Sequence, residues 1–277
     1  MPKDSENRSA DVVIDPLAAV APNAQLGTGV KIGPFCHIGP DVVLGDGVEL
    51  LSHVVVDGHT TIGAGTKVFP FASLGVAPQD LKYQGEPTTL VIGANCQIRE
   101  HVTAHRGTVH GPGETRIGDD SLIMIGVHVA HDCQIGRRAL FANNVTLGGH
   151  VTVGEQVFIG GLTAVHQFAR IGSYAYVGGM AAIRFDVIPC SIVMGADDGR
   201  LSGLNIVGLK RRGMSRDEIN TLRKVYKTMF REPGNMQDRF SRARELYKDE
   251  PVAQEILAFI SQDSERSYLK DGRSDDD

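Results

Sequence analysis

The sequence predicts a parallel β-helix built from six-residue repeats, followed by a small α-helical domain. A large apolar residue recurs at every sixth position from Ile117 to Ile183, and the fifth position of each hexad is small or β-branched. A helix would favour spacings of three and four, and a half-buried strand would alternate, so neither explains a period of six. A sustained period of this kind indicates a repeat architecture.

Each coil of the predicted β-helix has three flat sides, and each side is one hexad. The first and fifth residues of a hexad point inward, and one coil of three hexads stacks on the next at about 4.8 Å, the spacing of paired strands. Glycine often follows the first residue, which suits corners where the backbone must turn sharply or take positive φ. One coil has too little core to be stable alone, so stacking must bury its interior.

The first half of the chain carries the same repeat with two interruptions. Residues 1–11 are expected to form a disordered polar lead, and the β-helix is expected to span residues 12–190. Inserted loops are predicted at 80–91 and 104–116, and the second insertion shifts the phase of the repeat by one residue. Loops that project from a rigid scaffold commonly carry function.

Residues 191–277 are predicted to form the helical domain and its tail. Ser215 and Glu218 have the spacing of a capping box and precede an apolar stripe with helical spacing. Further helices are expected over about 236–247 and after Pro251, and the final DGRSDDD is expected to be a solvated tail.

Composition narrows the class of protein. The net charge of −5 argues against general nucleic-acid binding. No apolar run is long enough to span a bilayer, and the N-terminus has no apolar signal region, so we expect a cytosolic protein without stable membrane insertion. Cys36, Cys96 and Cys133 fall on inward positions and form no CxxC pair, which favours small buried hydrophobes; the role of Cys190 stays open.

Chemistry is expected where the histidines gather. All ten histidines lie in the repeat region, seven of them between residues 101 and 166. With a coil of 18 residues, position 131 stacks under 149 and 167, and 132 under 150 and 168. His131, Gly149 with His150, and His166 with Gln167 should therefore follow one edge of the prism, on outward or corner positions. A lone surface histidine is usually only solvated, but the aligned set favours a site.

Four motifs resemble one family of enzymes. They are HVAHDC at 128–133, LGGH at 147–150, TAVHQF at 163–168 and NIVGLKRRG at 205–213. Together with the hexapeptide repeat they resemble the cytosolic UDP-N-acetylglucosamine O-acyltransferases of lipid A biosynthesis, from about Val12 to the C-terminal helices. The repeat alone is shared by many acyltransferases, whereas the ordered motif set with a helical tail is specific.

The resemblance implies a homotrimer of left-handed parallel β-helices with active sites between subunits. The implied reaction moves a 3-hydroxyacyl chain from acyl carrier protein to the 3-hydroxyl of the sugar in UDP-N-acetylglucosamine. It implies no metal or redox cofactor, because the phosphopantetheine arm comes with the carrier protein.

The chemistry of this transfer assigns roles to residues that match the family. A sugar hydroxyl needs a base as it attacks a thioester, and histidine suits that task. By resemblance His131 is the base, Asp132 orients its imidazole or favours its protonated form, and the backbone N–H of Gly149 stabilises the oxyanion. A covalent acyl-enzyme is not expected, because Cys133 lies on an inward position.

Further residues are expected to bind the substrates. The sugar is assigned to polar side chains near the base, and the nucleotide to the two inserted loops. By resemblance or position these residues are His128, His150, Gln167 and, as a weaker candidate, His166, with Asp80 and Lys82 on the first loop and His105 and Arg106 on the second. Arg106 is equally well explained as ordinary solvated charge.

The basic step at 210–212 is expected to bind an acidic partner. Lys210, Arg211 and Arg212 could dock acyl carrier protein or a phosphate, with Asn205 as a companion. By resemblance Gly179 lies near the end of the acyl tail, where the lack of a side chain would leave room for a longer chain.

Three alternatives stay open at this point. A zinc enzyme of the same fold needs three protein ligands, and only His105 and His110 have a plausible spacing. A non-catalytic scaffold would not need the histidines to align. An N-acyltransferase acting on a 3-amino sugar nucleotide could use the same base, although its relatives usually carry an additional N-terminal domain.

Overall fold

The computed structural model describes residues 11–196, 199–262, 264 and 267–269. Residues 1–10 of the expected polar lead and the expected tail at 271–277 lie outside these residues. The chain forms two compact units, Met1–Asp132 and Cys133–Asp277.

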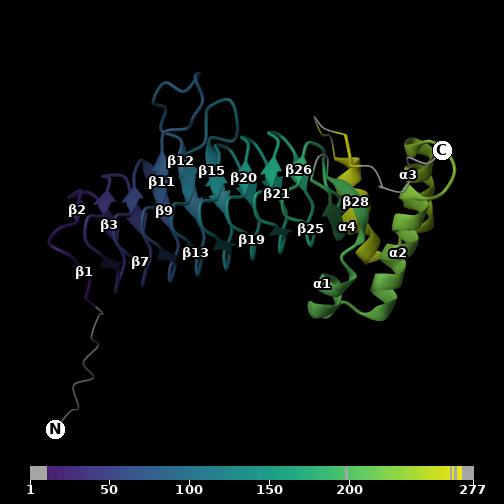
Figure 1. Cartoon of the computed structure of the whole chain (residues 1–277), viewed down its shortest axis with the longest axis horizontal. Helices are drawn as coiled ribbons and strands as arrows, with labels where there is room; N and C mark the ends of the chain where they lie inside the picture. Colours follow the sequence, from purple (N-terminus) through teal and green to yellow (C-terminus); the bar gives the residue numbers. More distant parts are fainter. Residues whose placement is uncertain (1–10, 197–198, 263, 265–266, 270–277) are drawn as a thin grey trace, which may run out of the picture. The chain divides into compact units, whose positions relative to one another are not determined.

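The first unit is a β-helix whose three sides are parallel sheets (Figure 1). One side contains, in spatial order, β1 (Val13–Ile14), β4 (Lys31–Ile32), β7 (Glu49–Leu50), β10 (Lys67–Val68), β13 (Gln97–Ile98) and β16 (Leu122–Ile123). The next side contains β2 (Ala19–Val20), β5 (His37–Ile38), β8 (Val55–Val56), β11 (Ser73–Val76), β14 (Thr103–His105) and β17 (His128–Val129). The third contains β3 (Gln25–Leu26), β6 (Val43–Leu44), β9 (His59–Ile62), β12 (Thr89–Ile92) and β15 (Glu114–Ile117).

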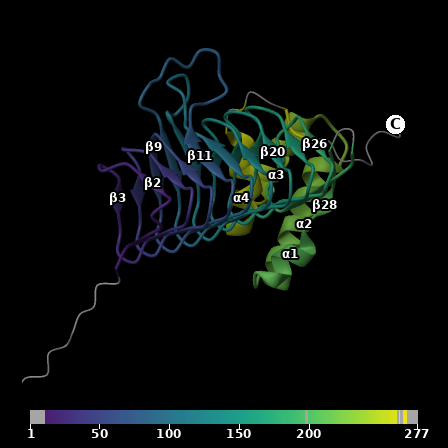
Figure 2. The same ribbon diagram turned by 60° about the vertical axis from the view of Figure 1, so that its left-hand side comes forward.

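Two insertions lengthen the coils of this unit. Regular coils pair residues 18 positions apart, as Val13 pairs with Lys31, but Lys67 pairs with Gln97. The additional residues form the loops 77–88, between β11 and β12, and 106–113, between β14 and β15. β12 thus begins inside the first insertion predicted from sequence, because its residues pair with strands on both sides. Both loops project from the same side of the unit (Figures 1 and 2).

The interior of the coils follows the hexad pattern. Ile117 and Ile123, at first positions, are fully buried, and so are Val127 and, within 2%, Ser121 at fifth positions. The predicted inward cysteines are also buried, and burial raises the pKa of Cys96 to about 11. A buried thiol of this kind packs as a small hydrophobe rather than as a nucleophile.

The glycines after the strands permit close approach between coils. Of the two reasons expected for them, a sharp turn or a positive φ, the second applies to Gly75 but not to Gly136 or Gly148. A Cβ on Gly148 would lie 2.7 Å from the backbone nitrogen of Gln167 on the next coil. Positive φ also occurs at larger corner residues, such as Asp132 (62°), His150 (61°) and Phe168 (65°). Each corner therefore holds a side chain in an orientation that the turn dictates.

The second unit begins with further coils of the same kind. Its sheets contain β18 (Gln134–Ile135), β21 (Thr152–Val153) and β24 (Arg170–Ile171); β20 (Thr146–Leu147), β23 (Ala164–Val165) and β26 (Ala182–Ile183); and β19 (Leu140–Phe141), β22 (Phe158–Ile159), β25 (Tyr176–Val177), β27 (Ser191–Met194) and β28 (Arg200–Leu204). β27 pairs parallel to β25, whereas β28 is antiparallel to β27. Strand structure therefore continues past residue 190, where the sequence pattern ends.

Four helices complete the second unit. They are α1 (Ile206–Arg211), α2 (Arg216–Phe230), α3 (Met236–Leu246) and α4 (Pro251–Ser261). The predicted capping box of Ser215 and Glu218 starts α2, whose apolar stripe is buried. Sequence analysis did not predict the short α1. Among the described helices, none has the length and apolar character needed to cross a membrane.

Candidate active site

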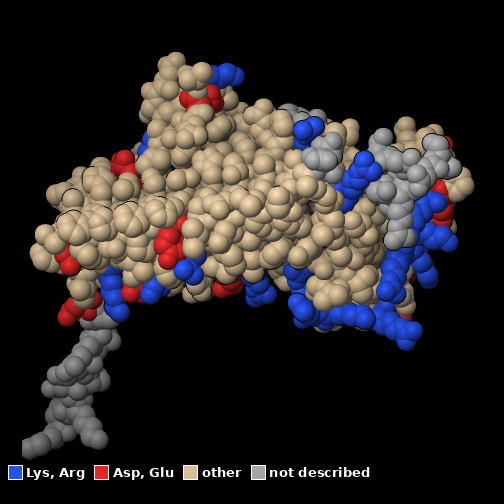
Figure 3. Space-filling view, in the orientation of Figure 1, with Lys and Arg blue, Asp and Glu red and all other residues tan. Residues whose placement is uncertain are grey.

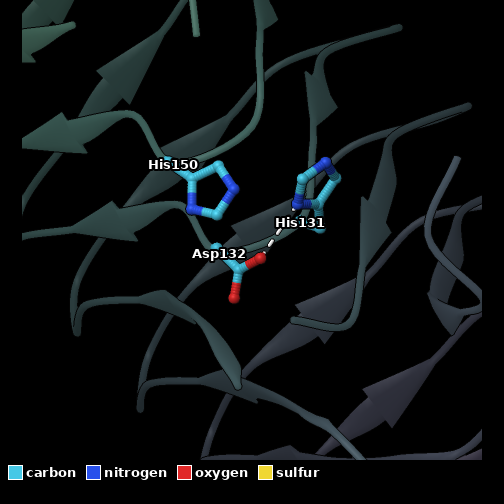
Figure 4. A group of neighbouring side chains, drawn as sticks. All are labelled: His131, Asp132 and His150. Atoms are coloured by element: carbon cyan, nitrogen blue, oxygen red, sulfur yellow. Dashed lines mark hydrogen bonds and ion pairs between the residues drawn. The ribbon is translucent and has the colours of Figure 1, made fainter. Parts of the chain in front are cut away.

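In the first unit, the corner after β17 carries the predicted base and its neighbour. Asp132 has a φ of 62°, and this turn directs its carboxylate back toward the preceding side chain. Nδ1 of His131 lies 2.9 Å from Oδ2 of Asp132 (Figure 4). The side chain of His131 is 16% exposed and that of Asp132 is fully buried. Adjacent side chains often diverge, but here they form a direct hydrogen bond.

The second inserted loop surrounds the Asp132 carboxylate with donors. The backbone N–H of Thr108 lies 3.0 Å from both carboxylate oxygens, and its hydroxyl donates to Oδ2 at 2.7 Å. The N–H of Asp132 donates to the hydroxyl oxygen of Thr115 at 2.8 Å. An ionised carboxylate only accepts hydrogen bonds, so Nδ1 of His131 carries the hydrogen of their shared bond. Nε2 of a neutral His131 is then left with a lone pair that can accept a proton.

Two further histidines lie beside this pair on neighbouring strands: His105 ends β14 and His128 begins β17. The rings of His105 and His128 meet edge to face, with centroids 4.9 Å apart. Burial, reinforced by the nearby charges of His128 and His131, lowers the pKa of His105 to about 4. Burial and the charge of His131 also lower the pKa of His128, whose Nδ1 lies 2.7 Å from the hydroxyl of Thr103. Both rings are therefore held neutral, as hydrogen-bonding groups rather than cations.

The first inserted loop carries Asp80 and Lys82 on its surface. The backbone N–H of Lys82 donates to Asp80 at 3.0 Å, and this bond, with nearby positive charge including that of His131, lowers the pKa of Asp80. Arg106, on the second loop, donates to the hydroxyl of Tyr83 at 2.9 Å. Arg106 thus joins the two loops and is more than a solvated charge.

In the second unit, the equivalent corners carry Gly149 with His150, and Gln167 with Phe168. Gly149 is buried, and its carbonyl accepts from the N–H of Phe168 at 3.0 Å. The ring of His150 stacks on Phe168 at 4.5 Å with an interplanar angle of 6°. The stacking expected from an 18-residue coil is therefore present in this unit. Figure 4 labels His150 together with His131 and Asp132.

The other sugar candidates of this unit are exposed. His166 and Gln167 lie on the surface, and Nδ1 of His166 is 3.1 Å from the carbonyl oxygen of Gln167. Gly179 is also exposed and lies against the neighbouring corner, so a Cβ there would be 3.1 Å from the carbonyl oxygen of Gly161. A side chain at position 179 would therefore change the surface formed by these two corners.

Asn205 performs a structural task. Its side-chain oxygen accepts from the N–H of Gly208 and caps α1, while its amide donates to the carbonyl of Tyr174 at 3.0 Å. The residue is only 8% exposed. Both ends of this amide have protein partners, so it positions the basic step that follows.

The basic step lies at the end of α1. Lys210, Arg211 and Arg212 are exposed, and Arg212 also donates to the carbonyl of Gln156 and lies 5.0 Å from the centre of the Tyr174 ring. Figure 3 shows lysine and arginine side chains gathered over α1 and α2. Arg223, Lys227 and Arg231 of this surface line a hollow of about 380 Å³. The surface suits an acidic partner.

Sequence analysis missed the residues that support the predicted ones. Thr103, Thr108 and Thr115 contact His128 or Asp132, and Tyr83 holds Arg106. Only their position in or beside the insertions could have indicated them. Among the described residues, no close group of three metal-ligating side chains includes His105 or His110.

The repeat and the second unit match known family models. Residues 23–58 and 114–149 match the bacterial transferase hexapeptide model, and residues 186–269 match the second domain of UDP-N-acetylglucosamine O-acyltransferase. These matches define the chain as a hexapeptide-repeat transferase with an additional helical domain.

Whole-chain comparisons identify the family within this class. The acyl-[acyl-carrier-protein]–UDP-N-acetylglucosamine O-acyltransferase of Caulobacter vibrioides is 51% identical over 253 residues, covering 91% of this chain and 96% of the relative. That of Sinorhizobium fredii is 49% identical over 94% of this chain and 96% of its own length. The crystal structure of Francisella novicida UDP-N-acetylglucosamine acyltransferase has a TM-score of 0.92 at 36% identity, covering 94% of this chain and 95% of that one.

The chain therefore belongs to the acyl-[acyl-carrier-protein]–UDP-N-acetylglucosamine O-acyltransferase family. The fold class predicted from sequence, a left-handed parallel β-helix followed by a helical domain, is confirmed.

Proposed function

We propose that this chain transfers a 3-hydroxyacyl group from acyl carrier protein to the 3-hydroxyl of the sugar of UDP-N-acetylglucosamine, the first step of lipid A biosynthesis. The relatives that share about half of its residues are named for this acyl transfer to this nucleotide. The observation that carries the proposal is the His131–Asp132 hydrogen bond, which leaves Nε2 of His131 as a base at a partly exposed corner.

The proposed mechanism is direct transfer. Nε2 of His131 takes the proton of the sugar hydroxyl as its oxygen attacks the thioester carbonyl carbon. The N–H of Gly149 stabilises the oxyanion of the tetrahedral intermediate. The intermediate collapses by breaking the carbon–sulfur bond, and the departing thiolate takes the proton back from His131. The products are the O-acylated sugar nucleotide and the thiol of the carrier protein, and His131 returns to its neutral form.

The same proposal assigns binding roles around this centre. The neutral imidazoles of His105 and His128 suit hydrogen bonds to hydroxyl and acetamido groups, because they avoid an uncompensated buried charge. His150, His166 and Gln167 supply further polar groups, and Asp80 and Lys82 are assigned to the nucleotide. Gly179 is assigned to the end of the acyl chain.

The proposed partners follow from charge and from the family. Lys210 and Arg211 are exposed at the end of α1, where they would dock the acidic carrier protein, which brings its own phosphopantetheine arm. The thioester is already activated for acyl transfer, so the protein needs no cofactor of its own. We further propose a homotrimer that works in the cytoplasm, with each site completed between subunits.

The decisive experiment measures acyl transfer from 3-hydroxyacyl carrier protein to UDP-N-acetylglucosamine. Wild type should be active, and His131→Ala should lose about 10²- to 10⁴-fold in kcat, the usual contribution of a general base. Melting curves and sedimentation of both proteins control for folding and trimer formation.

The same assay separates the alternatives. Activity only with the 3-amino sugar nucleotide would make the chain an N-acyltransferase. Inactivity with both acceptors, together with stoichiometric zinc in the purified protein, would favour a metal enzyme, since His131 and Asp132 are of metal-ligating types.

A further inference from the structure

The hydrogen bonds of the second inserted loop converge on one side chain. Thr108 gives the Asp132 carboxylate two donors, its backbone N–H and its hydroxyl. The hydroxyl shares Oδ2 with Nδ1 of His131, at 2.7 and 2.9 Å respectively. Thr108 is 1% exposed, so its contact with the carboxylate is shielded from water. One oxygen therefore divides its negative charge between a fixed hydroxyl and the imidazole.

The loop backbone is built to reach this position. Gly107 precedes Thr108, and a Cβ on it would collide with the backbone of Gly113 and Glu114 and would lie 2.8 Å from Oδ1 of Asp132. Its N–H donates to the carbonyl of Thr89 at 3.1 Å, which anchors the start of the loop on β12. Only a residue without a side chain permits this approach. The N–H of Thr89 in turn donates to the carbonyl of Gly113 at 2.9 Å, so both ends of the loop that carries Thr108 are anchored on β12.

We propose that Thr108 is a positioning residue for the base, and that its hydroxyl tunes the basicity of His131 through Asp132. This inference rests on the proposed function, in which His131 removes the proton of the acceptor. The Thr108 hydroxyl holds Oδ2 in place, and Oδ2 in turn holds Nδ1 of His131. It also shares this oxygen with Nδ1 of His131.

Because the hydroxyl and the imidazole share Oδ2, loss of the Thr108 hydroxyl should move the acid limb of the pH–rate profile to higher pH. Without the hydroxyl, Oδ2 keeps more negative charge and attracts the protonated imidazole more strongly. His131 then loses its proton only at higher pH, and the acid limb of the pH–rate profile moves upward. Within the first unit, the titratable groups in electrostatic contact with His131 include His105, His128 and Asp80, besides Asp132 itself. Thr108→Val leaves these groups in place, so a shift in the pH of the acid limb reports the lost hydroxyl.

The test compares wild type with Thr108→Val and Thr108→Ser in the full-length protein. We measure kcat and KM for UDP-N-acetylglucosamine from pH 5 to 9 with 3-hydroxyacyl carrier protein as donor. Thr108→Val should lower kcat about tenfold, the effect of one lost hydrogen bond to a charged group. Its acid limb should move up by roughly half a pH unit or more. KM should change little. Thr108→Ser should restore both kcat and the pH position of the acid limb to their wild-type values.

Thr115→Val is the matched control. Thr115 is equally buried and also contacts Asp132, but its hydroxyl accepts from the backbone N–H and does not touch the carboxylate. This variant should lose thermal stability without moving the acid limb. A melting curve for each variant confirms that the rates refer to folded protein.

Two outcomes would overturn the proposal. One is a Thr108→Val enzyme whose acid limb coincides with that of wild type, whatever its kcat, because a merely structural threonine would behave in that way. The other is a Thr108→Ser enzyme that is as impaired as Thr108→Val, which would make the methyl group the important part. An inactive wild type would instead contradict the proposed function, so the two failures are distinguishable.

Discussion

Two fully buried aspartates, one in each unit, have opposite kinds of partner. Asp132 bonds to a histidine that is partly exposed, and to a threonine of a loop. Asp186 receives the backbone N–H and Nε of Arg170, both at 2.8 Å, and the hydroxyl of Ser264 at 2.6 Å. Arginine stays protonated at any pH that the fold survives, whereas histidine changes charge near neutrality.

The difference separates a pair that can exchange protons from a pair that only holds segments together. Arg170 also reaches the side chains of Gln262 and Tyr268, and its guanidinium lies 4.5 Å from the centre of the Phe259 ring. Asp186 therefore fastens the residues around α4 to the last coils of its unit. Burial of a carboxylate by itself indicates neither role; the ability of its partner to titrate distinguishes them.

The largest expected effect comes from neutralising each aspartate in turn. Asp132→Asn should lower kcat about 100-fold or more, because an amide has one acceptor oxygen for the donors of Thr108 and His131. Asp186→Asn should instead lower the free energy of unfolding by about 3 kcal/mol, because it leaves Arg170 buried without its counter-charge. Its kcat, measured at a temperature where it is folded, should stay within threefold of wild type. A large loss of kcat in Asp186→Asn would remove the contrast.

A second effect concerns acid stability around Asp132. His105 has a pKa of about 4 in the fold and near 6.5 when unfolded, so the unfolded chain binds a proton that the folded chain does not. Stability should therefore fall as pH drops from about 6.5 toward 4, by on the order of 2–3 kcal/mol from this group. His105→Gln should reduce that loss, as measured by urea unfolding at pH 7.5 and 5. Equal losses in wild type and variant would show that His105 is not the source.

The smallest effect is expected at the arginine of the second pair. Arg170→Lys keeps the charge but loses the planar guanidinium that bonds Asp186 through Nε and stacks near Phe259. The free energy of unfolding should fall by about 1–2 kcal/mol, less than in Asp186→Asn, because the backbone N–H of residue 170 still donates. Urea unfolding of Arg170→Lys and Asp186→Asn under one set of conditions shows which variant loses more free energy of unfolding.

The sequence predicted the regular parts of the fold because each coil repeats one packing rule. The hexad period identified the buried residues, and the Ser215–Glu218 spacing located α2. The sequence analysis missed β27, β28 and α1, because these short elements follow neither the six-residue repeat nor a sustained helical spacing of apolar residues. Strand β12 was placed too late because residues 89–92 continue a ladder that the apolar spacing alone does not reveal.

The candidate site was predicted in part for the same reason. Coil spacing aligned the corner residues Gly149, His150 and Gln167, and the pairing of His150 with Phe168 follows that spacing. The hydroxyl of Thr108 reaches Asp132 only through the path of an irregular loop, and no period describes such a path. Contacts within insertions depend on local backbone geometry, which the sequence pattern does not contain.

The hydrogen bonds that Arg170 and Ser264 donate to Asp186 also have a consequence for the order of folding. Ser264 is 78 residues further along the chain, so a ribosome delivers the aspartate well before its hydroxyl partner. Early coils can stack as they emerge, since each needs only its neighbours. The coil that contains Asp186 can pair this carboxylate with Arg170 as it emerges, but the hydroxyl of Ser264 arrives only with the segment after α4. We therefore expect the last of these hydrogen bonds to form late in folding.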